Sequence, residues 1–218
     1  MKMIKIKKNK EPNSLVSYKK KEGACYDGPD FTDVKNDIKE SLLQEQGYIC
    51  AYCMCRISKS TMKVEHWACQ SKHPEKQLEY KNLLGCCKGG EGFSPMQQTC
   101  DTHKGNLDIT YSPTDDIFSS DDFIKYTSRG KIASSNERFD LEINDVLHLN
   151  DPRLILNRKI ILDKIQKELH ERKGSIKETE INRLITKYKQ KNCNNEHLEY
   201  FGVIVSYLMA KRKKPTNR

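Results

Sequence analysis

The stretch MKVEHWACQ, from Met62 to Gln70, lies between two cysteine-bearing segments, CAYC at Cys50–Cys53 and TCDTHKG at Thr99–Gly105. It places an acid, Glu65, directly before a histidine, His66. An isolated Glu-His pair is more often a solvated surface feature than an active site. If metal-bound cysteines hold both flanking segments, however, they also fix the position of this pair.

The cysteines favour a metal site. The chain has nine in 218 residues, and an odd number without an apolar leader segment argues against a disulfide framework. Cys50 and Cys53 have the spacing that chelates one tetrahedral ion, and structural zinc requires two further ligands. Cys100 is one candidate, while Cys86 and Cys87 compete for the other. A redox CxxC would need a thioredoxin-like βαβ pattern, which the sequence lacks. We expect four thiols to be unliganded: Cys25, Cys55, Cys69 and Cys193.

The residues between these cysteines have the chemistry of phosphodiester hydrolysis. A neutral imidazole at His66 can take a proton from water, and the adjacent carboxylate of Glu65 can bind Mg²⁺ or Mn²⁺. Asp101 follows Cys100 directly and offers a second oxygen ligand. Asn82 could hydrogen-bond the backbone of the loop that carries His66 and so orient the ring.

Charge is concentrated at the two ends of the chain. Residues 1–24 hold eight lysines against two glutamates, and residues 211–218 hold five basic residues and no acid. The body between them is close to neutral, so part of a nucleic-acid surface could come from a partner. Lysine-rich ends that only aid solubility explain the charge equally well. The sequence lacks an apolar run of about 18 residues, so we expect a cytoplasmic chain without a membrane span.

Patterns in the first 150 residues predict a mixture of helices and short strands. Residues 1–30 read as a basic, irregular arm. Thr32 is the expected cap of a helix over 33–46, which Gly47 ends. KVEHW and KNLLGCC predict two strands, and CDTHKGNL predicts a short helix. A hairpin is expected over 122–133, with its turn at Ser128-Arg129-Gly130.

From Asp151 the pattern is helical. Pro152 begins a helix that is expected to reach Gly174, and Ser175 and Glu178 form a capping box for the next one. The last helix carries Leu198, Phe201, Ile204, Val205 and Leu208. Tyr200, Val203 and Tyr207 widen its apolar surface, which favours contact with a partner, whereas the helix at 153–173 is better explained as core. A dimerisation or docking role for these helices is a third, weaker reading.

The order of these motifs is similar to that of a known protein family. The order CAYC, VEHW, NLLGCC and TCDTHKG resembles the zinc-bearing HNH endonucleases, whose ββα-metal, or His-Me finger, site has these parts in this order. The resemblance implies that His66 is the general base, that Glu65 and Asp101 bind the catalytic metal, and that Asn82 is the middle asparagine. It also implies that Cys87, rather than Cys86, is the third zinc ligand. The family often has Asn or His at position 101, and the aspartate found here keeps an oxygen ligand. His103 is a minor candidate because it would point away from the ion.

A wider resemblance covers roughly residues 1–160. The approach LLQEQGYICAYC, the DFIKYTSRGKI hairpin and LHLNDPRLILNR are similar to PtuB-like HNH subunits of Septu and retron-associated anti-phage systems. That resemblance implies a PtuA-like ABC/SMC-type ATPase as partner, a hetero-oligomer, and DNA or RNA as substrate.

Together these observations predict an α+β fold with a ββα-metal core and a structural zinc knuckle, surrounded by amino- and carboxy-terminal helices. The expected organisation is a basic arm and helix over 1–47, the nuclease core over 48–110, a hairpin and connecting segment over 111–150, and a helical region with a basic tail over 151–218. The expected function is a metal-dependent HNH endonuclease. The alternative is a zinc ribbon that binds nucleic acid without cutting it.

Overall fold

The structure is a computed structural model that describes residues 5–171 and 176–212. Two antiparallel strands, β1 (Met62–His66) and β2 (Leu83–Cys87), form a hairpin in the amino-terminal half. Their register pairs Glu65 with Leu84 and His66 with Leu83, so the acid–histidine pair lies at one end of the hairpin. The strands predicted at KVEHW and KNLLGCC are confirmed.

A long helix, α2 (Phe31–Gln46), packs against β2 and buries the predicted stripe of Val34, Ile38 and Leu42. It ends at Gly47, whose φ of 65° is a left-handed conformation that glycine adopts without a steric penalty.

The predicted cap of this helix is wrong. The residue before the first helical position is Asp30, which makes no side-chain cap bond, and Thr32 lies within the first turn. The helix begins earlier because the Phe31 ring is buried against the rings of Tyr18 and Tyr26, 5.0 and 4.8 Å away between centroids.

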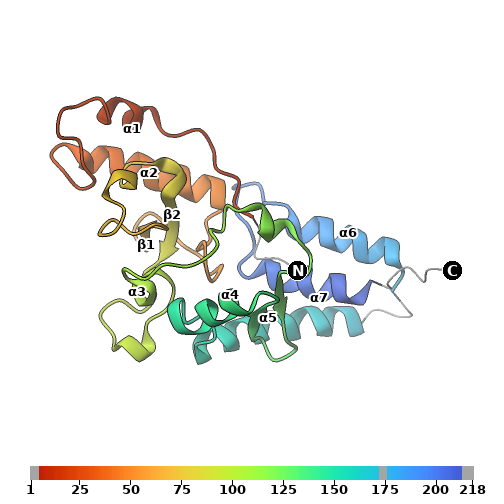
Figure 1. Cartoon of the computed structure of the whole chain (residues 1–218). Helices are drawn as coiled ribbons and strands as arrows, with labels where there is room; N and C mark the ends of the chain where they lie inside the picture. The colour runs from red at the N-terminus through yellow and green to blue at the C-terminus, as the bar shows by residue number, and fades with distance from the viewer. Residues whose placement is uncertain (1–4, 172–175, 213–218) are drawn as a thin grey trace.

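The amino-terminal arm is not irregular throughout, contrary to expectation. A short helix, α1 (Asn13–Tyr18), lies along α2 and buries Leu15 and Tyr18 against it (Figure 1). Two apolar residues three positions apart are enough to dock one helical turn on a hydrophobic surface but give little periodic signal in the sequence.

After the hairpin, the short helix α3 (Cys100–Lys104) lies beside β2, as CDTHKGNL predicted. Its first residue is also tied to a later part of the chain, because the Cys100 amide donates to the Leu147 carbonyl at 2.8 Å. Four 3-10 turns connect these parts: η1 (Pro74–Lys76), η2 (Tyr80–Asn82), η3 (Pro95–Gln97) and η4 (Asp116–Ser119).

The second hairpin, β3 (Ile124–Tyr126) and β4 (Ile132–Ser134), confirms the prediction for 122–133. Gly130 in its turn has φ of 84°, and a Cβ there would lie 2.5 Å from the Ile155 carbonyl oxygen, so only glycine fits. A short helix and a π-helical turn follow: α4 (Glu137–Leu141) and η5 (Glu142–Val146).

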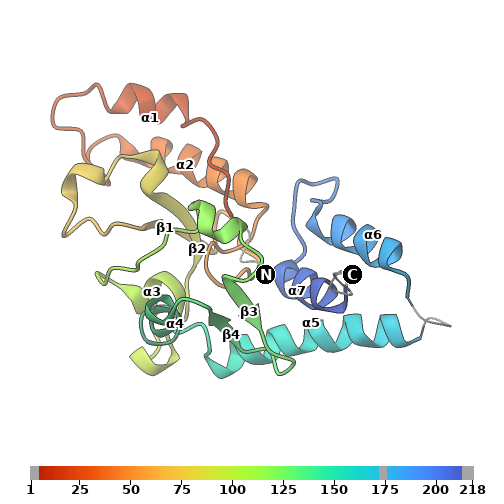
Figure 2. The same ribbon diagram turned by 45° about the vertical axis from the view of Figure 1, so that its right-hand side comes forward.

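Three helices complete the chain: α5 (Pro152–His170), α6 (Glu178–Lys189) and α7 (Phe201–Lys211). Pro152 is the first helical residue of α5, as predicted, and the Asp151 side chain accepts from the Arg153 amide at 2.9 Å. In Figures 1 and 2, α7 packs against both α5 and α6.

Helix α5 ends at His170, and the expected end Gly174 and capping residue Ser175 lie outside the described residues. The residue before α6 is Lys177, which makes no side-chain cap bond. The predicted capping box includes Ser175 and therefore stays a prediction.

Most of the apolar surface that was predicted to contact a partner on the last helix is instead buried within this chain, while Tyr207 is half-buried. Val203, Val205 and Leu208 are fully buried, Tyr200 is 5% exposed, and Leu198 precedes the helix and is 46% exposed. The wide apolar circumference of α7 reflects its place in the core between two helices.

Buried hydrophobic side chains form two clusters. One combines α1, α2, the β1–β2 hairpin, and the segment from Ile109 to Leu154. The other is built on α5, α6 and α7, and it includes Ile49 and Met54, which flank the CAYC turn. The chain is therefore a mixed helix-and-strand protein with two small sheets. Among the described residues, every helix is too short or too polar to span a bilayer.

Candidate metal centre and active site

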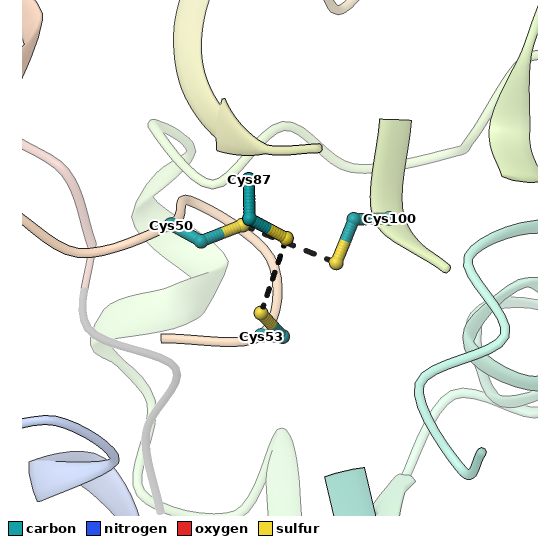
Figure 3. Close-up of side chains that lie close together, drawn as sticks. All are labelled: Cys50, Cys53, Cys87 and Cys100. Carbon is teal, nitrogen blue, oxygen red and sulfur yellow. Dashed lines mark hydrogen bonds between the residues drawn. The ribbon is translucent and has the colours of Figure 1, made fainter. Parts of the chain in front are cut away.

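Four cysteine sulfurs from three separate segments converge: those of Cys50, Cys53, Cys87 and Cys100 lie within 4.8 Å of one another (Figure 3). The Cys50 and Cys100 sulfurs are 3.9 Å apart, and those of Cys53 and Cys87 are 3.8 Å apart. A tetrahedron with arms of about 2.3 Å, the zinc–sulfur distance, has edges of about 3.8 Å. The group could therefore bind a metal ion such as zinc.

Backbone contacts shape the CAYC turn and attach it to the hairpin. The Cys50 amide donates to the Cys55 carbonyl at 2.9 Å, and Met54 takes the left-handed conformation with φ of 65°. The Ala51 amide donates to the Gly85 carbonyl in β2 at 2.9 Å. The side chain of Gln46 binds both the amide and the carbonyl of Gly85, at 2.7 and 2.8 Å, and so links the end of α2 to the same strand position.

Strand geometry separates the two competing cysteines. Successive side chains of a strand point to opposite faces, so Cys86 and Cys87 leave β2 in opposite directions. Cys87 joins the group of four, whereas Cys86 is fully buried and does not, although its thiol reaches that of Cys50. The hydrogen bond with the Cys100 thiol lowers the pKa of Cys87.

Cys25, Cys55, Cys69 and Cys193 lie outside the group of four, as expected. Cys55 nevertheless borders it, because its thiol is within hydrogen-bonding range of the Cys50, Cys53 and Cys87 thiols.

His66, the last residue of β1, is 7% exposed and has a defined tautomer. Its Nε2 lies 3.0 Å from the carbonyl oxygen of Gln77. Because a carbonyl oxygen can only accept, Nε2 carries the proton, and Nδ1 of the neutral ring is left with its lone pair. Burial lowers the pKa of His66, so the ring is neutral near pH 7.

Asn82 secures the loop that follows His66. Its Oδ1 accepts from the Ala68 amide at 2.8 Å, and its Nδ2 donates to the Ala68 carbonyl at 3.0 Å. The Asn82 carbonyl also accepts from the Trp67 amide at 3.0 Å. The side chain is 5% exposed, so these bonds hold the chain directly after His66 in one conformation.

Glu65 is 3% exposed, and two protein donors meet one of its oxygens. The hydroxyl of Tyr52 and Nζ of Lys104 each lie 2.9 Å from Oε1. Burial raises the pKa of the Glu65 carboxyl group, and the neighbouring Asp101 carboxylate, which is within hydrogen-bonding range, raises it further.

Asp101 is the second residue of α3, directly after the cluster sulfur of Cys100. Its carboxylate forms an ion pair with Nζ of Lys63 at 3.3 Å. It acts electrostatically on both Glu65 and His66.

His103 makes different contacts. Its Nδ1 is 2.9 Å from the Val146 carbonyl oxygen, and its ring lies 4.9 Å from that of His148 between centroids. These contacts are with η5 and the residues after it rather than with Glu65.

Three residues of this region, Lys104, Tyr52 and Gln77, were not predicted from the sequence. Lys104 had a usable signal, because it stands three residues after Asp101 on a helix and therefore on nearly the same face. Tyr52 lies inside the CAYC turn and Gln77 in an irregular loop, where no periodicity indicates direction.

Two known proteins are similar to the chain, and no family model matches it. The "Septu protein PtuB" of Bacillus thuringiensis is 27% identical over 165 residues, which cover 73% of this chain and 62% of PtuB, less than two thirds of its length. The "Retron Vc95 putative HNH endonuclease" of Vibrio cholerae serotype O1 biovar El Tor is 28% identical over 178 residues, which cover 75% of this chain and 84% of the retron protein. The resemblance that the motifs predicted is thus confirmed: the chain is similar to PtuB and to an HNH-type retron protein over about three quarters of its length.

Proposed function

We propose that this protein is a metal-dependent HNH endonuclease that hydrolyses phosphodiester bonds of nucleic acid, with His66 as the general base. The single observation that carries the proposal is the state of His66. Its Nε2 proton is held by the Gln77 carbonyl at 3.0 Å, so the lone pair on Nδ1 is free to accept a proton from water. The lowered pKa of His66 keeps the ring in this form near pH 7.

Glu65 and Asp101 suit a divalent cation such as Mg²⁺ or Mn²⁺. The Asp101 carboxylate raises the pKa of Glu65 because two neighbouring carboxylates repel each other when both are ionised, and a hard cation held by both would relieve that repulsion. Mg²⁺ is commonly held by one or two carboxylates together with substrate phosphate and water. When bound, the ion would stabilise negative charge on the phosphate and on the leaving oxygen. Lys104 and Tyr52 would hold Glu65 in place through Oε1.

The four-cysteine group would hold a structural zinc ion that fixes this arrangement. Cys87 ends β2 and Cys100 begins α3, so one ion would join the hairpin that carries Glu65 and His66 to the helix that carries Asp101. The order β1, β2, α3 with this metal site is what supports a ββα-metal core, formed within the proposed nuclease region 48–110.

We further propose that the protein works in anti-phage defence, as the nuclease subunit of a complex with a PtuA-like ABC/SMC-type ATPase. The support is the similarity to a Septu protein and to a retron protein. A body of nearly neutral charge between basic ends is compatible with a nucleic-acid surface that is completed by another subunit.

A panel of end-labelled DNA and RNA oligonucleotides, incubated with the protein as copurified from its host, tests the proposal. We expect strand cleavage with Mg²⁺ or Mn²⁺ and none with EDTA. Binding without cleavage under all metal conditions would instead support the alternative, a zinc ribbon that only binds nucleic acid.

A further inference from the structure

We propose that Tyr26 is a further residue of the active site and that its hydroxyl donates a hydrogen bond to a non-bridging oxygen of the scissile phosphodiester. The inference rests on the proposed function and extends it to a residue outside the cysteine and His-containing motifs.

The ring of Tyr26 lies against the proposed base. Its centroid is 4.4 Å from that of His66, at an interplanar angle of 84°, so the two rings meet edge to face. The backbone of Tyr26 is fixed to the same loop, because its amide donates to Oε1 of Gln77 at 3.0 Å and the Gln77 carbonyl accepts from His66. Gln77 thus binds both residues and fixes the position of one ring relative to the other.

Other contacts leave the ring little freedom. Phe31 packs on it at 4.8 Å between centroids, and Nζ of Lys35 lies 5.1 Å from the ring centroid. Lys35 is itself held by Asp27 at 2.8 Å. Tyr26 is therefore positioned by Phe31, Lys35, His66 and Gln77 together.

The hydroxyl of Tyr26, in contrast, is buried and has no hydrogen-bond partner in the described part of the chain. A buried donor without an acceptor is unfavourable and is uncommon in folded proteins unless a ligand or water completes it. Burial raises the pKa of this hydroxyl, and the fields of Asp27 and Asp101 raise it further, so it stays protonated. The 4.4 Å contact between the Tyr26 and His66 rings places Tyr26 beside the proposed base.

A phosphate oxygen is the acceptor that this position would meet during the proposed reaction. The oxygen gains negative charge as the phosphodiester is attacked, and a fixed O–H donor stabilises that charge without reorganisation. The bond strengthens toward the transition state, so its loss should lower kcat more than it raises KM.

Tyr26→Phe tests this because it keeps the ring and removes only the hydroxyl. We expect kcat to fall at least about tenfold, with KM within about twofold, and with thermal stability and bound zinc not reduced. Tyr18→Phe is the matched control. Tyr18 also packs on Phe31, at 5.0 Å between ring centroids, but its hydroxyl already donates to the Cys25 carbonyl at 3.0 Å. That variant should lose some stability and keep the wild-type kcat.

Wild-type kcat in Tyr26→Phe would overturn the inference while leaving the proposed function intact. If Tyr26→Phe lowers kcat but also lowers the unfolding temperature or the zinc content, the inference is overturned, since Tyr26 then has a structural role. Absence of any metal-dependent cleavage by the wild-type protein would remove the proposed function and this inference with it.

Discussion

Nζ of Lys104 lies 2.9 Å from Oε1 of Glu65, and the two side chains are 0% and 4% exposed. Each belongs to a different element, α3 and β1, so the ion pair joins the helix to the hairpin at the centre of the proposed active site. The Lys104 charge opposes the effects of burial and of Asp101 and favours the ionised form of Glu65 that a metal ion requires.

Replacing Lys104 by methionine should therefore destabilise the fold and weaken metal binding. Removing one partner of a buried ion pair costs about 3–5 kcal/mol in free energy of unfolding. Lys63→Met is the control, because Lys63 pairs with Asp101 at a side chain that is 32% exposed, and such pairs contribute about 1 kcal/mol or less. Urea unfolding and Mn²⁺ titration measure both effects. Equal, small losses in the two variants would show that the Lys104–Glu65 pair has no special role.

Substituting the two adjacent cysteines of β2 should have different consequences. Cys87→Ser should reduce bound zinc well below one ion per chain and lower the unfolding temperature, because its sulfur is one of the four that converge. Cys86→Ser should keep the ion, although it places a polar group in a fully buried position. Zinc content by elemental analysis of reduced protein distinguishes them, and loss of zinc from Cys86→Ser alone would reverse the ligand assignment.

Cleavage should depend on pH through His66. Burial lowers the pKa of this ring below the unperturbed value of about 6.5, with Asp101 and Asp27 opposing the shift and Lys104 reinforcing it. The base acts only when neutral, so kcat/KM should be constant near pH 7 and should fall only below about pH 6.5. The lowered pKa of His66 also makes the stability of the fold decrease as the pH falls. The unfolded chain binds the proton more readily, so the contribution of His66 is present above pH 6.5 and is lost as the pH falls. An acidic limb centred above pH 6.5 would contradict the assigned cause.

Helix α7 should behave as core rather than as a docking surface. Val205→Asp places a charge at a position with 0% exposure between α5 and α6, and we expect a loss of several kcal/mol in free energy of unfolding. Leu198→Asp, at a side chain that is 46% exposed, should change stability by about 0.5 kcal/mol or less. Circular dichroism with urea unfolding measures both, and a stable Val205→Asp protein would restore the idea of a partner surface on this helix.

The sequence predicted those parts of the fold that are determined by local pattern. The alternating KVEHW strand, the glycine at the end of α2 and the hairpin turn at Gly130 each depend on residues within a few positions of one another. The cap at Thr32 failed because tertiary packing of the Phe31 ring starts the helix two residues earlier.

The site was predictable where residues stand next to a motif and unpredictable where distant segments meet. Glu65, His66 and Asp101 could be proposed as site residues because they adjoin cysteines or each other. The sequence alone could not choose between Cys86 and Cys87, since that choice depends on which face of β2 meets the CAYC turn. The contact of Tyr26 with His66 joins residues 40 positions apart, and no local pattern signals it.

The most direct test of the account compares His66→Ala with the wild-type protein for cleavage and zinc content in the same preparation. Single-turnover cleavage of a labelled substrate with Mg²⁺ should fall by about 10²–10⁴-fold, while zinc stays at the wild-type level, because His66 is outside the four-cysteine group. Cleavage by His66→Ala at the wild-type rate, with zinc bound, would contradict the assignment of this histidine as the base.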